Sequence, residues 1–113
     1  MPASPNVVRP SDADWTPTEP GVKRRILTYN DDLMLVEVAF EKGAVGSEHR
    51  HPHIQATVVA KGRFDVTISG KTETLVAGQS FIVPSDELHG VSALEDGVLL
   101  DSFAPMRADF LAG

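Results

Sequence analysis

Hydrophobic and polar residues alternate with a period of two along most of the chain after the first twenty residues. This is the period of β-strands with one face buried, whereas a helix would repeat about every 3.6 residues. A short continuous apolar run closed by proline predicts a buried strand. The clearest predicted strands are Met34–Phe40, Phe64–Ile68, Phe81–Val83 and Val98–Phe103, and only residues 106–111 favour a short helix.

Turn-forming residues separate the predicted strands at regular intervals. The predicted turns are Gly70-Lys71, Ala77-Gly78 and Glu95–Gly97. Seven or eight short strands joined in this way indicate an all-β fold, either a sandwich or a closed barrel. A small barrel can hold one ligand in its interior.

The first twenty residues differ from the rest, because they contain five of the eight prolines. Proline lacks the backbone donor that a helix needs, and it biases the preceding residue away from helix. We therefore predict an extended arm over residues 1–20 and one barrel domain over residues 21–113. Trp15 is predicted to anchor this arm on the domain or on a second subunit, with a disordered arm as the alternative.

Composition narrows the classes of protein that remain. A chain of 113 residues suits a single domain, and no apolar run approaches the length of about 20 residues needed to cross a bilayer. The N-terminal segment lacks the pattern of a secretory signal, so a cytoplasmic location is expected. The chain has no cysteine, so any metal has to be bound through nitrogen and oxygen.

The net charge of −6 sets a condition on any ligand. The one basic run, Lys23–Arg25, is predicted to lie on a solvated strand edge, so no nucleic-acid partner is expected. An acidic chain repels anions weakly, so an anionic substrate would need a local cluster of positive charge.

Three of the four histidines lie in the stretch HRHPHIQ, residues 49–55. On a strand, His49 and His51 point to the same face, and Gln55 can reach the same space with its amide oxygen. The fourth histidine, His89, follows a predicted buried strand and in a meander can lie on a strand beside them. Three imidazoles and one amide oxygen predict a site for a divalent transition metal.

The spacing of these residues resembles the two sequence motifs of the cupin superfamily. The first motif has glycine, two histidines, glutamate and glycine at fixed spacings. In the same register the chain has Gly43, His49, His51, Gln55 and Gly62, with glutamine in place of glutamate. The second motif is matched by Gly78, Pro84 and His89, while Asp86 and Ala93 replace a glycine and an asparagine. The resemblance covers roughly residues 33–103 and implies a jelly-roll barrel with a metal inside, commonly in a homodimer.

Two of these departures have physical consequences. Aspartate tolerates left-handed backbone better than most residues, so the turn at Asp86 is expected to persist. A glutamate ligand would cancel one unit of the metal's charge, whereas Gln55 leaves the whole charge in place. In a pocket drier than water, this uncancelled charge favours an anionic ligand.

The C-terminal stretch, taken with HRHPHIQ, resembles the KdgF-type cupins of pectin and alginate breakdown. Those proteins convert 4,5-unsaturated monouronates into linear keto sugars. The resemblance implies His49, His51, Gln55 and His89 as the metal ligands. It also implies Asp101, Phe103 and Arg107 as catalytic residues, in a D-x-F-x-P-x-R-x-D-F pattern that is complete here.

The residue types support these roles but leave alternatives open. An unpaired carboxylate in an apolar strand is costly, so Asp101 either makes a structural hydrogen bond or moves a proton. The planar guanidinium of Arg107 either binds a uronate carboxylate or forms a surface ion pair with Asp109. Phe103 is either a substrate contact or a core residue. His53 is either a surface residue or a support for the metal ligands.

Three functions therefore compete at this stage. The first is a metal-dependent enzyme that opens and ketonises a small anionic sugar acid, an unsaturated uronate. The second is a non-haem metal dioxygenase that uses the same ligands, and the third is a non-catalytic module that binds a small acid or sugar. The ligand set accepts nickel, zinc, iron or manganese, so it does not identify the metal.

Overall fold

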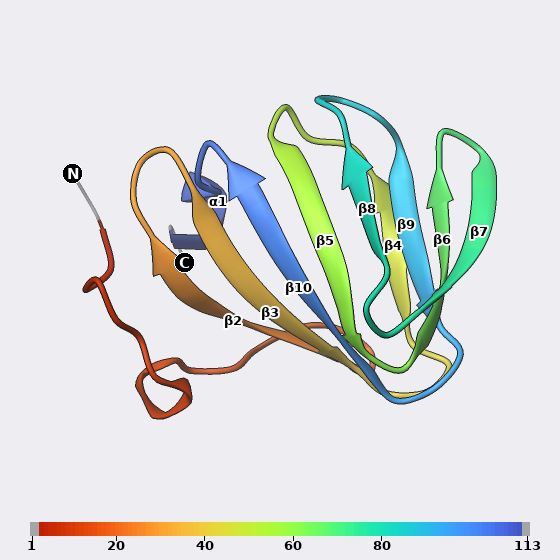
Figure 1. Ribbon diagram of the computed structural model, residues 1–113, viewed down its shortest axis with the longest axis horizontal. Coiled ribbons are helices and arrows are strands. Elements are labelled where there is room, and N and C mark those ends of the chain that lie inside the picture. The colour runs from red at the N-terminus through yellow and green to blue at the C-terminus, as the bar shows by residue number, and fades with distance from the viewer. Residues whose placement is uncertain (1–2, 112–113) are drawn as a thin grey trace.

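The computed structural model describes residues 3–111 and consists mainly of two antiparallel sheets that face each other (Figure 1). The six-stranded sheet has the order β1 (Thr16–Glu19), β2 (Val22–Tyr29), β3 (Met34–Phe40), β10 (Gly97–Ala104), β5 (Ile54–Lys61) and β8 (Ser80–Val83). The four-stranded sheet has the order β4 (Val45–His49), β9 (His89–Ala93), β6 (Arg63–Ile68) and β7 (Lys71–Val76). A 3₁₀ turn, Pro10–Asp12, precedes the first strand, and a short helix, α1 (Ala108–Leu111), follows the last.

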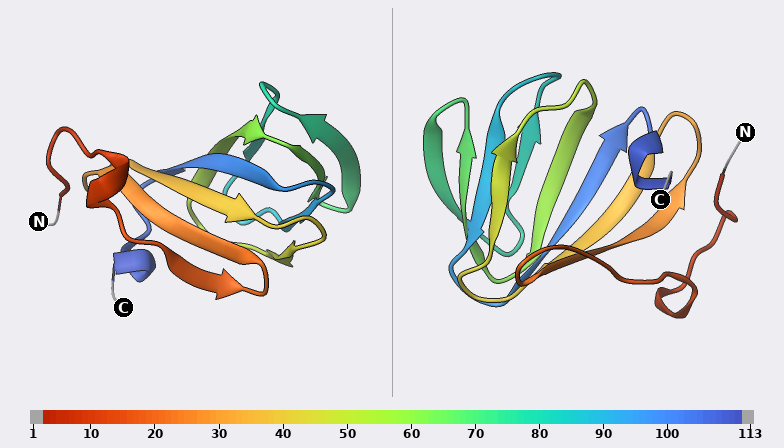
Figure 2. Two further views of the ribbon diagram at one scale, coloured as in Figure 1. Left: turned by 90° about the horizontal axis from the view of Figure 1, so that it is seen from below. Right: turned by 180° about the vertical axis from the view of Figure 1, so that it is seen from behind.

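This arrangement confirms the predicted all-β jelly roll with a short C-terminal helical turn. Within residues 3–111 the two sheets are separate hydrogen-bonded units, so the roll consists of two layers rather than one continuous cylinder. Figure 2 shows the two layers from other sides, with α1 beside the β2 end of the larger sheet. No helix in the described part of the chain is long and apolar enough to cross a membrane.

Ten strands are present among the described residues, against the seven or eight predicted. One of them, β1, lies in the proline-rich segment and pairs with β2 at the edge of the larger sheet. Residues 1–2 and 112–113, at the outer ends of the predicted arm and domain, lie outside the described residues. Trp15, next to β1, packs on the domain as predicted, since the charged ends of Lys23 and Arg25 lie 4.6 and 4.2 Å from its ring.

The basic run on β2 does not lie on a solvated edge, because β1 and β3 flank this strand on its two sides. Strand alternation separates the three charges between the two faces of the sheet. Lys23 and Arg25 share the face that Trp15 covers, whereas Arg24 points to the interior with Val22. The prediction was wrong here because the proline-rich segment gave no sign of β1, the strand that covers this edge.

Two local predictions also differ from the structure. The reversal between β6 and β7 is centred on Ser69-Gly70, one residue earlier than predicted, and both residues have positive φ. Such a pair of left-handed residues matches the twist of a two-residue hairpin. In β8, predicted to be buried throughout, Ile82 is 62% exposed and points away from the other sheet.

Two apolar clusters fill the space between the layers and leave a polar zone between them. The larger cluster includes Phe40 and Phe64, whose rings meet edge to face at a centroid distance of 5.1 Å. The second cluster joins Met34, Val36 and Phe103, and Phe110 of α1 packs against it. The side chains between these clusters form the candidate site.

Gly62, in the turn from β5 to β6, provides a test of the fold. Its φ is +85°, and a Cβ at this position would lie 2.6 Å from the backbone oxygen of Asp96. Gly62→Ala is therefore expected to lower the free energy of unfolding by more than the roughly 1–2 kcal/mol that left-handed backbone alone costs an L-residue. Urea denaturation measures the loss.

Gly70→Ala is the matched control, because Gly70 has a φ of +81° and no heavy atom within 4 Å of a built Cβ. This variant isolates the backbone cost from the steric cost. Equal losses in the two variants would contradict the close approach at Gly62.

Candidate metal centre and its cavity

Three imidazoles meet where the smaller sheet begins. His49 ends β4 and lies opposite His89, the first residue of β9, in the antiparallel pairing of these strands. His51 follows β4 by two residues, and its ring lies 4.8 Å from that of His89, centroid to centroid. One ligand atom from each of the three residues lies within 4.8 Å of the other two. Segments about 40 residues apart are thus brought to one point by the pairing of β4 with β9.

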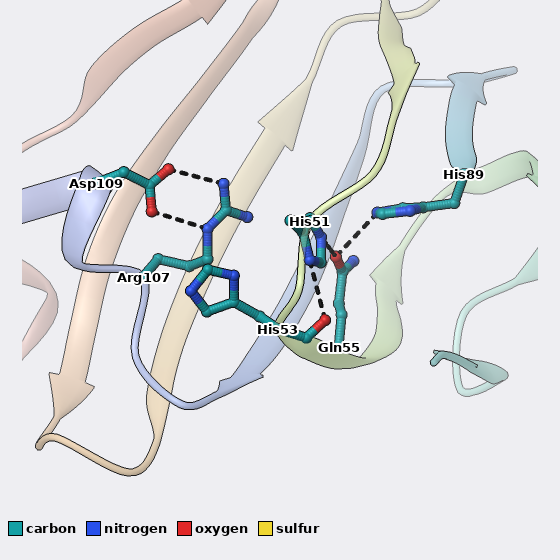
Figure 3. Close-up of polar contacts among 6 residues, drawn as sticks. All are labelled: His51, His53, Gln55, His89, Arg107 and Asp109. Carbon is teal, nitrogen blue, oxygen red and sulfur yellow. Dashed lines mark hydrogen bonds and ion pairs between the residues drawn. The ribbon is translucent and has the colours of Figure 1, made fainter. Parts of the chain in front are cut away.

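The side-chain amide of Gln55 completes this group (Figure 3). Its Oε1 lies 3.1 Å from Nε2 of His51 and 3.2 Å from Nε2 of His89. Its Nε2 donates a hydrogen bond of 3.0 Å to Oγ1 of Thr57, which fixes the amide with its oxygen toward the histidines. All four side chains singled out by their spacing in the sequence therefore lie together.

Backbone carbonyls hold the Nδ1 atom of each imidazole. Nδ1 of His49, His51 and His89 lies 2.9, 3.0 and 2.9 Å from the carbonyl oxygens of Ser47, His53 and Glu87 respectively. A carbonyl can only accept a hydrogen bond, so each ring carries its proton on Nδ1 and has a lone pair on Nε2. In His51 and His89 that lone pair points at another acceptor, the amide oxygen of Gln55.

The two buried rings, those of His51 and His89, are also in the protonation state that metal binding requires. Burial is the main cause that lowers the pKa of His89 to about 4, and it also lowers the pKa of His51. Both rings are therefore neutral near pH 7 and are able to donate a lone pair. Lone pairs that converge without a proton between them, as on His51, His89 and the Gln55 oxygen, are what a divalent transition metal requires of its donors.

His53 lies next to this group without joining it. Its backbone oxygen accepts the hydrogen bond from Nδ1 of His51, so the residue supports that ring through its main chain. Its own ring is half-buried, and its Nδ1 has no hydrogen-bond partner among residues 3–111.

Asp101 lies beside the amide and is buried in β10. It shares the inner face of that strand with Leu99 and Phe103, as the alternation predicted. Thr57 Oγ1 donates a hydrogen bond of 2.7 Å to its Oδ1. Burial raises the pKa of Asp101 to about 6, while the hydrogen bond from Thr57 and the charge of Arg107 act in the opposite direction.

Arg107 is buried between aromatic rings at the other side of the cavity. Its guanidinium carbon lies 4.2 Å from the ring centroid of Phe110 and 5.0 Å from that of Phe103. Its Nε and Nη2 donate to the two oxygens of Asp109 at 3.0 and 2.9 Å (Figure 3). The ion pair named as the alternative role is thus present, and it joins an Arg107 side chain that is only 11% exposed to an Asp109 side chain that is 58% exposed.

Phe103 fits both descriptions that the sequence left open. It is 3% exposed and packs in the second apolar cluster, as a core residue does. Its ring also lies 5.7 Å from the ring of His51 and against Arg107, so it separates the histidine group from the core.

These groups line a single cavity of about 410 Å³, a size usual for small-molecule sites. The lining includes His49, Gln55, His89, Asp101, Phe103 and Arg107, together with apolar side chains of β3 and β10. Arg24 of β2 also lines this cavity. The arrangement can bind a metal, an acid and a small apolar surface in the same space.

Known proteins share this arrangement of strands and sequence. The sequence profile described as "Cupin domain" matches residues 36–102. The chain belongs to the cupin family. Pectin degradation protein KdgF of Dickeya dadantii (strain 3937) is 48% identical to this cupin over 99 residues, which are 86% of the chain and 90% of the relative.

Two solved structures match this cupin over nearly its whole length. An RmlC-like cupin from Shewanella frigidimarina NCIMB 400 superposes with a TM-score of 0.93 at 37% identity, covering 97% of this chain and 99% of the other. KdgF from Halomonas sp. superposes with a TM-score of 0.89 at 38% identity, covering 95% and 99%. The resemblance drawn from the two motifs is confirmed.

The structure also explains the departure at Asp86 in the second motif of this cupin. Asp86 has a φ of +64°, the left-handed conformation that the family's usual glycine adopts without strain. Its backbone N–H donates to the carbonyl of His51 at 2.8 Å. The aspartate therefore keeps the turn and ties the loop before β9 to the segment that carries His51.

Sequence reasoning missed two residues of the site, Thr57 and Arg24. Thr57 interrupts the apolar inner face of β5 two residues after Gln55, and this spacing is a signal that could have identified it. Arg24 lies two residues after Val22 and so shares its face of the strand. Val22 is buried, but the sequence alone did not identify it as an inner residue.

Thr57 joins Gln55 to Asp101, so its hydroxyl is expected to affect metal binding from outside the ligand set. Thr57→Val removes the acceptor that orients the amide, and we expect the affinity for a divalent metal to fall by about tenfold or more. Thr57→Ser keeps the hydroxyl and should stay near wild type. Metal titration of the chelator-treated protein, followed by calorimetry, measures both variants.

Circular dichroism of both variants is the control for folding. An unchanged metal affinity in a folded Thr57→Val variant would contradict the orienting role of this residue.

Proposed function

We propose that this cupin is a metal-dependent enzyme that converts 4,5-unsaturated monouronates from pectin or alginate lysis into linear keto sugars. The observation that carries the proposal is the shared cavity, in which three histidines positioned to bind a metal lie with a buried carboxylate and two arginines. The 48% identity to a protein named for pectin degradation supports the same substrate class.

His49, His51, Gln55 and His89 would hold the metal, because their donor atoms converge and carry lone pairs. A bound divalent ion supplies Lewis-acid polarisation of a substrate oxygen. The identity of the ion is left open among nickel, zinc, iron and manganese, all of which accept this donor set.

The donors bring no negative charge to the metal, since imidazole and amide are neutral. The full charge of the ion then acts in a cavity partly shielded from water, where an anion is bound more strongly than in bulk solvent. Arg107 adds a second positive charge at the other side of the cavity. A small sugar acid fits this distribution of charge.

Asp101 is proposed to move the proton in this reaction. The conversion is an isomerisation: the hemiacetal C–O bond breaks with its electron pair on the ring oxygen, the anomeric hydroxyl loses its proton to give the aldehyde, and the released enolate gains a proton on carbon to give the ketone. One proton is removed and one is added, so a single carboxyl group can serve both steps. Asp101 lines the cavity with one oxygen held by Thr57, which fixes its direction.

Phe103 and Arg107 are proposed to orient the substrate. Phe103 forms an apolar wall next to His51, against which the sugar ring can pack. Arg107 is kept in place by Asp109 and Phe110 and directs positive charge into the cavity.

Asp101→Asn tests the function directly, because it keeps the size of the side chain and removes its acid–base chemistry. We expect the rate of loss of the ultraviolet absorbance of the conjugated double bond to fall by about 10²-fold or more, with the metal content unchanged. Asp65→Asn is the matched control, since Asp65 lies on β6, outside the residues that line the cavity.

Treatment with a chelator should abolish the activity, and re-addition of the native metal should restore it. Equal rates for wild type and Asp101→Asn would contradict the proposed proton transfer. Oxygen uptake with loss of substrate would instead indicate the dioxygenase, and binding of the acid without product would indicate a binding module.

The protein is further proposed to be a homodimer, with the outer face of the larger sheet as the interface. Outward side chains of β3, β5, β8 and β10 form an uncharged patch of Leu35, Ala56, Val58, Ile82 and Leu100, and the ion pair of Glu37 with Arg25 borders it. Apolar patches that cross several strands are typical of interfaces between subunits. A second copy related by a two-fold axis would cover this patch with its own equivalent patch.

A cytoplasmic location also remains a prediction.

Analytical ultracentrifugation tests the assembly. Wild type should sediment as a dimer, and Ile82→Glu should shift the protein to monomer, because a charge within an apolar interface is costly to bury. Val76→Glu is the control, since Val76 is 45% exposed on β7 of the other sheet. A monomeric wild type would rule out the dimer.

A further inference from the structure

Arg24 is a charged residue of the cavity for which the proposed mechanism has no role. Alternation along β2 places it on the inner face with Val22, which is buried in the larger apolar cluster. Its partner in the neighbouring strand is Val38, which also lines the cavity. Arg24 therefore belongs to the same space as His89 and Asp101.

Arg24 and Arg107 are held next to each other by one aromatic ring. The guanidinium carbon of Arg24 lies 3.6 Å from the ring centroid of Phe110, and that of Arg107 lies 4.2 Å from it. The proximity of the two like charges is unfavourable: burial and the charge of Arg107 both lower the pKa of Arg24. Asp109 is the acidic residue that opposes this repulsion at Arg24.

The hydrogen bonds of the two arginines differ. Arg107 has its Nε and Nη2 engaged by both oxygens of Asp109. Arg24 makes no side-chain hydrogen bond or ion pair with any of residues 3–111, although it is half-buried. Asp109 is thus hydrogen-bonded to only one of the two guanidiniums, and Glu19 at the rim is bound to Ser47. Arg24 keeps guanidinium donors that have no hydrogen-bond partner among the described residues, and these donors can bind an anion.

We propose that Arg24 binds the carboxylate of the substrate directly, together with the Nη1 side of Arg107. This inference rests on the proposed function and deepens it, because it assigns recognition of the acid to a residue outside the family motifs described above. The planar guanidinium presents paired donors that match the two oxygens of a carboxylate. Arg107, which is bound to Asp109, then acts mainly by holding its own positive charge in place and by enclosing the bound acid.

The alternative role for Arg24 is structural, since its stacking on Phe110 ties β2 to α1. Binding measurements separate the two roles. D-galacturonate is a hexuronic acid without the double bond, and D-galactose is its uncharged counterpart. Titration calorimetry of both sugars against the metal-loaded full chain gives the discrimination between acid and neutral sugar.

Arg24→Gln should lower the affinity for galacturonate by about tenfold or more, as expected for loss of a hydrogen-bonded charge pair, and leave galactose binding unchanged. Arg24→Lys should recover part of the loss, because it restores the charge without the fork. Lys23→Gln is the matched control: this neighbour faces Trp15 outside the cavity and should bind as wild type does.

An affinity for galacturonate that is unchanged in Arg24→Gln would overturn the inference, as would equal losses for the acid and the neutral sugar. Absence of galacturonate binding by wild type would overturn it as well. Turnover of the unsaturated uronate is measured separately. Turnover that persists with the Michaelis constant unchanged in Arg24→Gln refutes the role of Arg24 and leaves the proposed function standing. Arg24-dependent binding without turnover refutes the function instead.

Discussion

The pairing of β5 with β10 is the constraint on which the interior depends. In this register Thr57 lies opposite Asp101 and Gln55 lies opposite Phe103. A shift of one residue would turn Gln55 and Thr57 to the outer face and replace them with Ala56 and Val58. The hydrogen bonds from Gln55 to Thr57 and from Thr57 to Asp101 exist only in the observed register. The same two strands therefore fix the amide that faces the histidines and the carboxylate beside it.

A polar layer in this position is costly to the fold, and its hydrogen bonds reduce that cost. Burial of a carboxylate without a partner would be strongly unfavourable, which the raised pKa of Asp101 reflects. The hydroxyl of Thr57 supplies one hydrogen bond, and apolar clusters on both sides exclude water. An all-apolar layer would stabilise the roll more, so the retention of Gln55, Thr57 and Asp101 is best explained by the chemistry of the cavity.

The sequence predicted the elements that depend on spacing, and it failed where the answer depends on three-dimensional neighbours. The interval between His49 and His51 and the period of β10 are local features, so the clustering of the imidazoles and the burial of Asp101 were both predictable. The inner position of Arg24 depends on which face of β2 packs toward the other sheet, and the pairing of β2 with β1 could not be seen in the proline-rich segment. The exposure of Ile82 likewise depends on which sheet β8 joins. The sequence of an apolar run does not show whether both faces of the strand are buried or one is exposed to solvent.

The chain has a negative net charge, whereas two arginines place positive charge inside the cavity, and distance decides which of these charges a ligand experiences. The net charge of −6 is spread over the surface, where ions screen it beyond about 8–10 Å in physiological salt. Arg24 and Arg107 act at contact range inside a cavity with apolar walls, where screening is weaker. Asp109 neutralises only one of these two arginines. An anion that enters the cavity is therefore attracted by local charge, and the acidic surface mainly slows its approach without determining its affinity.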